Sequence, residues 1–178
     1  AEKFYEENRE NGISLCISKM SYTYHNGTKV FMRADFEAHP HEIVALVGPS
    51  GEGKTTLLRI MLALLHIQSG DEDLVGAKTG EVLTITPAAR RLFSYVPQGN
   101  TMFSGTIAEN MRNVRPDATD EEIKEVLIVS CAWEFVQKLP DGIYSKVGER
   151  GVGFSEGQAQ RLSIARALLR RAPILLLD

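Results

Sequence analysis

The stretch Gly48-Pro49-Ser50-Gly51-Glu52-Gly53-Lys54-Thr55 decides how the rest of the sequence is interpreted. It fits the pattern G-x-x-x-x-G-K-[ST], which is typical of a loop that binds phosphate groups. The apolar, β-branched residues 43–47 precede it and predict a buried parallel strand. Residues 56–65 follow it and predict a helix. The pattern requires a strand, a glycine-rich loop and a helix in this order.

The residue types of the loop suit a nucleoside triphosphate. Glycines let the backbone turn tightly with its N–H groups inward, and the following helix directs the positive end of its dipole to the same place. Lys54 is predicted to reach the β- and γ-phosphates, and the Thr55 hydroxyl to bind Mg²⁺. We therefore expect residues 48–55, with Thr56, to bind a nucleotide. The alternative is a glycine-rich turn without a ligand, and the completeness of the pattern argues against it.

The composition is ordinary for a soluble globular domain. The chain has 178 residues and a net charge of -3, which gives no support for nucleic-acid binding. Cys16 and Cys131 lie far apart between apolar residues, so we expect two buried free thiols. His39 and His41 have no third ligand nearby in the sequence and predict a solvated turn rather than a metal site. The sequence shows no membrane-spanning stretch and no signal peptide.

The first half of the chain predicts an α/β arrangement. Residues 1–12 are polar and predict a linker or an exposed helix end. Residues 13–18 and 30–36 flank a turn at 25–27 and predict a hairpin, of which the first strand has one buried face. Further strands are predicted at 74–75, 82–85 and 93–96.

The chain becomes mainly helical after residue 98. Helices are predicted at 107–111 and 119–132, and Thr119 with Glu122 forms a capping box at the start of the second. A long helix is predicted from Ser155 to about Arg171, where Pro173 stops it. The last predicted element is an apolar strand at 174–178.

At this point the sequence resembles the nucleotide-binding domain of ABC transporters, most closely the exporter type. The resemblance covers residues 13–178 and rests on five features in the order of that family. These are an A-loop aromatic at Tyr24, the Walker A loop at 48–55, a Q-loop glutamine at Gln98, a signature motif at 155–158 and Walker B at 174–178. Residues 103–110 and 147–151 are similar to the exporter stretches that follow the Q-loop and form the X-loop.

The resemblance implies an α/β fold with a P-loop NTPase core of the RecA type, an antiparallel β subdomain and a helical subdomain. It implies a linker at 1–12, an ATP-binding core at 13–97 and 163–178, and a helical subdomain that carries the signature at 98–162. We expect the fold to be incomplete at the C-terminus, because the family's catalytic glutamate, D-loop and switch histidine would follow Asp178. The chain alone is therefore expected to hydrolyse ATP poorly.

The resemblance also implies the roles of individual residues toward ATP and Mg²⁺. Tyr24 would stack on adenine, with Tyr22 as the alternative. Gln98 would contact Mg²⁺ and the attacking water, and Asp178 would bind Mg²⁺. Lys54, Gln98 and Asp178 thus form the expected catalytic set.

The signature motif implies a partner. In the family, the helix start at Ser155, Gly157 and Gln158 binds the γ-phosphate of ATP held by a second nucleotide-binding domain, so two domains form a head-to-tail dimer. Two residues depart from the pattern: Phe154 replaces a leucine, and Glu156 replaces a glycine. The Glu156 carboxylate could repel phosphate, or it could point away and help cap the helix.

The implied function is that of the ATP-binding domain of an ABC exporter. Such a domain works at the cytoplasmic face of the cell membrane, contacts the transmembrane domain of the same transporter, and couples ATP binding and hydrolysis to transport. Two alternatives stay open: a nucleotide-binding fragment without turnover, and a soluble ABC-type ATPase of repair or translation. The exporter-like stretches and the acidic net charge argue against the second alternative.

Overall fold

The computed structural model describes residues 1–99, 101–148 and 153–178. The described residues form two compact units, one of Ala1–Phe93 together with Asp178, and one of Ser94–Leu177. The subdomain boundaries expected from the sequence, near residues 97 and 163, stay a prediction. Within the described residues, no helix is both long enough and apolar enough to cross a membrane.

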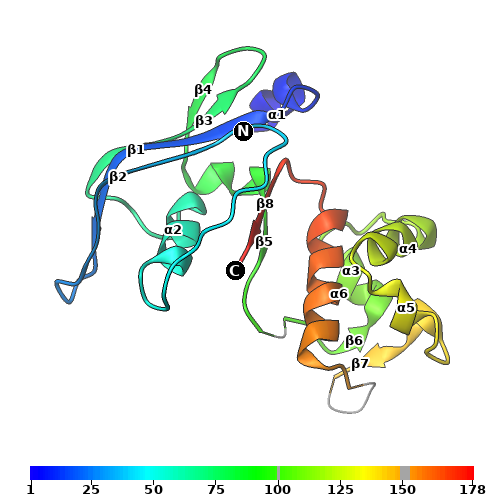
Figure 1. The fold of residues 1–178 in the computed structure, drawn as a ribbon. Coiled ribbons are helices and arrows are strands. Elements are labelled where there is room, and N and C mark those ends of the chain that lie inside the picture. The colour runs from blue at the N-terminus through cyan, green and yellow to red at the C-terminus, as the bar shows by residue number, and fades with distance from the viewer. Residues whose placement is uncertain (100, 149–152) are drawn as a thin grey trace. The chain divides into compact units, whose positions relative to one another are not determined.

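The first unit is built on a four-stranded antiparallel sheet with the strand order β2-β1-β3-β4 (Figure 1). The predicted hairpin is confirmed, since β1 pairs with β2 and places Leu15 opposite Ala38. Alternate residues of β1, such as Leu15 and Ile17, are buried in the core. The elements of the unit, in chain order, are α1 (Glu2–Asn8), β1 (Ile13–Thr23), β2 (Lys29–Ala38), α2 (Lys54–Met61), β3 (Ser69–Gly76), β4 (Val82–Thr84) and the 3-10 helix η1 (Pro87–Leu92).

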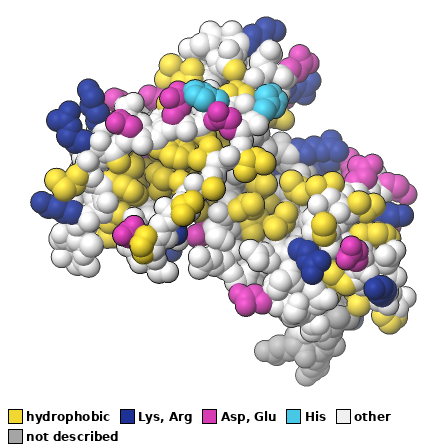
Figure 2. Space-filling model, in the orientation of Figure 1, with side chains coloured by type: hydrophobic (Ala, Val, Ile, Leu, Met, Phe, Trp, Pro, Cys, Tyr) yellow, Lys and Arg dark blue, Asp and Glu magenta, His cyan; other side chains and the backbone are white. Residues whose placement is uncertain are grey.

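The prediction of a buried strand before the phosphate loop was wrong. Residues 43–47 form no strand, and Ile43 and Val47 are almost fully exposed. A central parallel strand needs neighbours for its backbone groups, and no described strand pairs with this stretch. Hydrophobic side chains also gather on the face of the first unit that Figure 2 shows.

The helix after the phosphate loop is shorter than predicted. It ends at Met61 instead of reaching residue 65, and the backbone N–H of Leu62 caps it by bonding to Leu58 and Ile60. Ala63 then takes a left-handed conformation with φ of 50°. Arg90 donates to the carbonyl oxygens of Leu62 and Ala63, at 2.7 and 2.6 Å, and so fixes this helix end.

Residues 1–12, expected to be a linker or an exposed helix end, contain the packed helix α1. Phe4 and Asn8 are buried, with exposed fractions of 3% and 0%. Asn8 donates to the carbonyl of Phe4 and accepts a hydrogen bond from the hydroxyl of Thr79, which follows β3. The helix therefore packs through one apolar and one polar anchor.

The second unit arranges short helices around α6 (Figure 1). Its core contains fully buried side chains of four helices, among them Ile107, Met111, Ile123, Leu127 and Leu162. β5 pairs with β8, and β6 pairs with β7. The elements that follow β5 (Phe93–Val96) are β6 (Gly105–Thr106), α3 (Ile107–Arg112), α4 (Asp120–Val129), α5 (Trp133–Val136), the 3-10 helix η2 (Gly142–Tyr144), β7 (Lys146–Val147), α6 (Glu156–Leu169) and β8 (Ile174–Leu177).

Two predictions need correction, one about the helix at residues 119–132 and one about the two cysteines. The single predicted helix ends at Val129, because Cys131 has a left-handed φ of 57°, and α5 begins only at Trp133. Cys131 is exposed and Cys16 is partly exposed, so the two free thiols are not both buried as expected. The capping box of Thr119 and Glu122 is confirmed.

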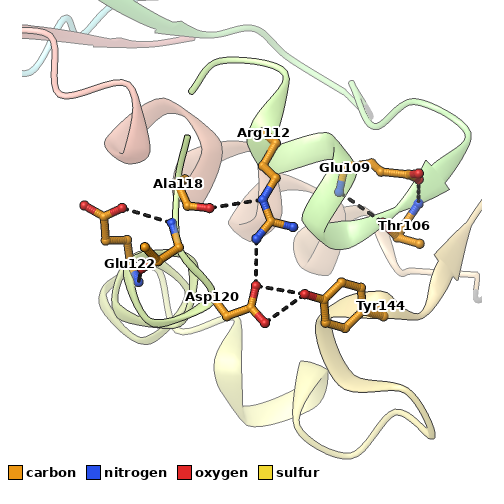
Figure 3. A network of polar contacts seen from close by, with 8 residues as sticks. Thr106, Glu109, Arg112, Ala118, Asp120, Glu122 and Tyr144 are labelled. Atoms are coloured by element: carbon orange, nitrogen blue, oxygen red, sulfur yellow. Dashed lines mark hydrogen bonds and ion pairs between the residues drawn. The ribbon is translucent and has the colours of Figure 1, made fainter. Parts of the chain in front are cut away.

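A polar network joins α3, α4 and η2 (Figure 3). Arg112 donates to the carbonyl of Ala118 at 3.0 Å and to the carboxylate of Asp120 at 2.7 Å. The Tyr144 hydroxyl donates to the same carboxylate at 2.8 Å. The hydrogen bonds from Tyr144 and Arg112 lower the pKa of Asp120, so this carboxylate stays ionised.

One carboxyl group that lies buried in the sheet of the first unit has an oxygen without a hydrogen-bond partner among the described residues. Glu72 of β3 is 8% exposed and lies opposite Ile17, and its Oε2 atom has no hydrogen-bond partner among the described residues. Burial, followed by the negative charge of Asp73, raises the pKa of Glu72 from 4.5 to about 7. The folded protein thus keeps a proton that the unfolded chain releases, so stability falls as the pH rises from 4.5 to about 7.

Replacement of Glu72 by glutamine is expected to stabilise the protein in a pH-dependent way. Glu72→Gln should raise the free energy of unfolding by about 1–3 kcal/mol at pH 8, because no charge is then buried, and change it little at pH 4.5. Denaturant unfolding at both pH values measures the difference. Asp71→Asn, at an exposed carboxyl of the same strand, is the control. An equal effect of Glu72→Gln on the free energy of unfolding at both pH values would contradict the raised pKa of Glu72.

Candidate nucleotide-binding site

The phosphate loop at 48–55 leads directly into α2, as the sequence predicts. Gly53 is the N-cap of the helix, and Lys54 and Thr55 are its first two residues. None of the described side chains caps this helix start. Its first N–H groups lie at the positive end of the helix dipole, so this end can bind an anion.

Gly53 meets two constraints at the junction between loop and helix. Its φ of 99° lies in the left-handed region that favours glycine. A Cβ atom on Gly53 would lie 2.6 Å from Cγ1 of Val30 and 3.1 Å from Cζ of Phe31, both on β2. The absence of a side chain therefore allows both the turn into α2 and the close approach of β2.

The Lys54 ammonium group is held by the loop itself. Its Nζ atom donates to the carbonyl oxygens of Gly48 and Pro49, each at 2.6 Å. The positive charge thus lies against the start of the loop, with carbonyl dipoles as its partners. Phosphate oxygens carry full negative charge and accept stronger hydrogen bonds than carbonyls, so they can replace these contacts.

A hydrogen bond joins two of the three residues predicted to bind Mg²⁺, Thr55 and Asp178. The hydroxyl of Thr55, in the first turn of α2, donates to Oδ1 of Asp178 at 3.0 Å, and both side chains are partly buried. These residues lie 123 positions apart in the sequence. A hydroxyl and a carboxylate supply the hard oxygen ligands that Mg²⁺ prefers, so the pair fits this ion chemically.

The Tyr24 side chain contacts the same helix. Its hydroxyl lies 2.8 Å from the hydroxyl of Thr56, which is buried. The ring of Tyr22 packs edge-on against that of Tyr24, with 5.1 Å between the centroids, and Tyr22 is itself 6% exposed. Tyr24 is the more accessible of the two rings. Sequence reasoning missed the contact with Thr56, since no local pattern links residues 32 positions apart.

The other predicted site residues lie in the second unit. Gln98 follows β5 and is exposed. Ser155 and Gln158 form the capping box of α6: the Ser155 hydroxyl accepts from the N–H of Gln158 at 3.2 Å, and the Gln158 side chain accepts from the N–H of Ser155 at 3.0 Å. This box does not use the exposed Glu156, and a Cβ atom on Gly157 would meet open space. Residues 149–151, expected in the X-loop, lie outside the described residues.

Comparison with known proteins identifies the family. The sequence profile described as "ABC transporter" matches residues 31–178, which is most of the chain. The chain belongs to the ABC transporter family. This result confirms the resemblance on which the sequence interpretation rests.

The relatives are named for export or transport, and this chain covers only a part of each. A Rickettsia felis protein named as an export ATP-binding/permease protein is 36% identical over 182 residues, which cover 98% of this chain and 30% of that protein. The mitochondrial iron-sulfur clusters transporter ATM1 of Candida albicans is 40% identical over 162 residues, which cover 91% of this chain and 21% of that protein. The chain therefore spans less than a third of the length of these relatives.

A solved structure confirms the fold. The structure of a bacterial Atm1-family ABC exporter with ATP bound matches with a TM-score of 0.82 and 30% sequence identity. The match covers 94% of this chain and 29% of that exporter chain. The predicted α/β fold of an ABC ATPase domain, with an antiparallel sheet, is thus confirmed, as is the exporter type.

Introducing a side chain at Gly53 is expected to damage the loop by steric overlap with Val30. Gly51→Ala is the matched control, because Gly51 has a φ of 88° and open space around its missing Cβ. Gly53→Ala should therefore destabilise the protein by about 1–3 kcal/mol more than Gly51→Ala. Thermal unfolding measures the difference.

The same experiment includes a rescue. Val30→Ala removes the Cγ1 atom that the new methyl group would meet. The double variant Gly53→Ala with Val30→Ala should thus recover most of the steric loss. It keeps the Val30→Ala cost, the backbone strain and the tighter contact of the new methyl group with Phe31. Equal unfolding temperatures for Gly53→Ala and Gly51→Ala would refute the packing constraint.

Proposed function

We propose that this domain binds Mg-ATP and hydrolyses it at the cytoplasmic face of the cell membrane, and so drives transport by an exporter. The observation that carries the proposal is the hydrogen bond between Thr55, at the end of the phosphate loop, and Asp178. It brings together two of the three expected Mg²⁺-binding residues beside a helix start that can bind phosphate.

The nucleotide is bound by the first unit. Lys54 exchanges its carbonyl partners for the β- and γ-phosphates, and the N–H groups of residues 51–56 donate to the phosphate oxygens. The Tyr24 ring stacks on adenine, which is supported by its partial exposure and by the burial of the alternative, Tyr22.

Thr55, Asp178 and Gln98 are the proposed Mg²⁺ ligands. The bound ion neutralises charge on the phosphates during phosphoryl transfer. The Thr55 hydroxyl would hold the ion through an oxygen lone pair, and the Asp178 carboxylate would supply a negatively charged oxygen. Gln98 also orients the attacking water through its side-chain amide.

A second copy of such a domain completes the site in this proposal. The α6 start at Ser155 and Gly157 is exposed, and its N–H groups can bind the γ-phosphate of ATP held by the partner. Glu156 lies exposed in the same first turn and brings a negative charge toward this position. The second partner is the transmembrane domain of the same transporter, as the export and permease names of the relatives support.

Two alternatives make different predictions. A nucleotide-binding fragment without turnover would bind ATP with the same residues and release no phosphate. A soluble ABC-type ATPase of repair or translation is disfavoured because the relatives described above are transporters.

Nucleotide titrations test the proposal. Lys54→Ala should weaken the affinity for a fluorescent ATP analogue about 10- to 100-fold both with Mg²⁺ and with EDTA, because charge-assisted hydrogen bonds to phosphate are lost. Asp178→Asn should weaken binding only when Mg²⁺ is present. Phosphate release by the full-length wild-type protein separates an ATPase from a binding module.

Asp141→Asn, at an exposed carboxyl in a turn of the second unit, is the control for Asp178→Asn. It should leave the affinity for the ATP analogue unchanged both with Mg²⁺ and with EDTA. Unaltered ATP affinity in Lys54→Ala would exclude the phosphate loop as the binding site. A loss in Asp178→Asn that is equal with Mg²⁺ and with EDTA would exclude the metal role of Asp178.

A further inference from the structure

Arg166 of α6 holds the segment that follows Gln98. Its Nη1 atom donates to the carbonyl oxygen of Thr101 at 3.0 Å, and its Nη2 atom donates to the Thr101 hydroxyl at 2.7 Å. The guanidinium group also lies over the ring of Phe103, 5.4 Å from the ring centroid. The Arg166 side chain thus contacts the backbone and the hydroxyl of Thr101 and the ring of Phe103.

Ser163, one turn earlier on α6, completes a directed chain of hydrogen bonds. Its hydroxyl donates to the carbonyl of Ala159 at 3.1 Å and lies 2.8 Å from the Thr101 hydroxyl. The Ser163 proton is used on Ala159, and Arg166 can only donate, so the Thr101 hydroxyl must donate to Ser163. Each hydroxyl therefore accepts one hydrogen bond and donates another. The order runs from Arg166 through Thr101 and Ser163 to Ala159.

The partners of Arg166 differ from those of Arg112 and Arg115 in the same unit. Arg112 and Arg115 pair with the carboxylates of Asp120 and Glu122, both at 2.7 Å, and Figure 3 shows the first of these pairs. Arg166 is half-buried, and burial is the cause that lowers the pKa of its side chain, with no carboxylate contributing. A desolvated cation gains most from well-placed acceptors, so its contacts favour one position of Thr101.

A second anchor fixes the other end of the segment. Asn110 of α3 is 1% exposed, and its side chain accepts from the N–H of Phe103 at 2.8 Å. It also donates to the carbonyl oxygens of Phe103 and Thr106, at 2.9 and 3.0 Å. Residues 101–106 are therefore held to α3 and α6 by buried or half-buried polar groups.

The short link to Gln98 makes this anchoring relevant to the nucleotide site. Thr101 lies three residues after Gln98, and three residues span at most about 11 Å when fully extended. On the other side, β5 ends at Val96, two residues before Gln98. The position of Gln98 is thus limited by β5 and by the contact between Thr101 and α6.

We propose that Arg166 and Ser163 are positioning residues that tie the Gln98 segment to α6, the helix that begins at the signature motif. A shift of the α6 start, where Ser155 would meet the partner's ATP, is then transmitted to the glutamine that orients the attacking water. The inference rests on the proposed function for the roles of Gln98 and Ser155.

A double-mutant cycle in the full-length protein tests the tie. Thr101→Val removes the hydroxyl from the chain at nearly constant shape, whereas Thr101→Ser keeps it. Thr101→Val should lower kcat for ATP about tenfold with KM changed less than about twofold, because a misplaced group costs rate rather than binding. Thr101→Ser should retain kcat. In a Gln98→Ala background, Thr101→Val should lower kcat by less than about twofold. The Gln98 side chain that Thr101 would help to position is then already absent.

Arg161 provides a matched control on the same helix. It donates to the carbonyl of Cys131 at 3.0 Å and lies over the ring of Phe135 at 5.5 Å, so it has the chemistry of Arg166 without touching residues 101–106. Arg166→Gln should increase amide hydrogen exchange in residues 94–99, and Arg161→Gln should not. This comparison reports on the tie without requiring any ATP hydrolysis.

The outcomes separate this inference from the proposed function. The inference is overturned by equal loss of kcat from Thr101→Val with and without Gln98→Ala, or by unchanged exchange in Arg166→Gln. Increased exchange in Arg166→Gln in a protein that releases no phosphate from ATP supports the tie and refutes hydrolysis alone. Increased exchange of the same size in Arg161→Gln overturns the tie, because the effect then comes from loosening of α6.

Discussion

The hydrogen bond from Thr55 to Asp178 is the contact on which the nucleotide site depends. One partner is positioned by the start of α2, which requires a glycine at position 53 so that the chain can turn and β2 can approach. The other partner follows β8 directly. A hydroxyl and a carboxylate that lie 3.0 Å apart can supply two of the hard oxygen ligands that Mg²⁺ prefers.

Arg112 is held differently from Lys54 and Arg166, and this difference matches their different roles. Arg112 pairs with Asp120, whose carboxylate also accepts from Tyr144, and such ionic pairing stabilises the contact between helices. Lys54 and Arg166 instead bond to carbonyl and hydroxyl oxygens. Neutral acceptors leave the Lys54 charge able to meet a phosphate, and they let Arg166 set the position of a backbone segment.

Local patterns predicted the parts of the fold that local interactions determine. The phosphate loop, the hairpin of β1 and β2, and the capping box at Thr119 each follow from residues close in sequence. The strand at 43–47 could not be judged in this way, because an apolar run does not reveal whether neighbours will pair with it. The helix ends before Ala63 and Cys131 gave no signal either, since neither residue type favours a left-handed φ.

The site residues also divide into those that local motifs predict and those whose contacts only the fold reveals. The sequence identified Lys54, Thr55 and Asp178 from their motifs, and the structure brings Thr55 and Asp178 together. The contacts of Tyr24 with Thr56 and of Arg166 with Thr101 join residues 32 and 65 positions apart. Nothing in a single sequence pairs such residues, so these contacts could be found only from the fold.

A structure of the full-length protein with Mg²⁺ and a non-hydrolysable ATP analogue tests the central claim most directly. The account predicts phosphates against the N–H groups at the start of α2, and a metal ion about 2.0–2.1 Å from Oγ1 of Thr55 with Asp178 beside it. Lys54 should have left the carbonyls of Gly48 and Pro49 for the phosphates. A nucleotide bound elsewhere, or Thr55 still donating to Asp178 with no metal between phosphate and protein, would contradict the account.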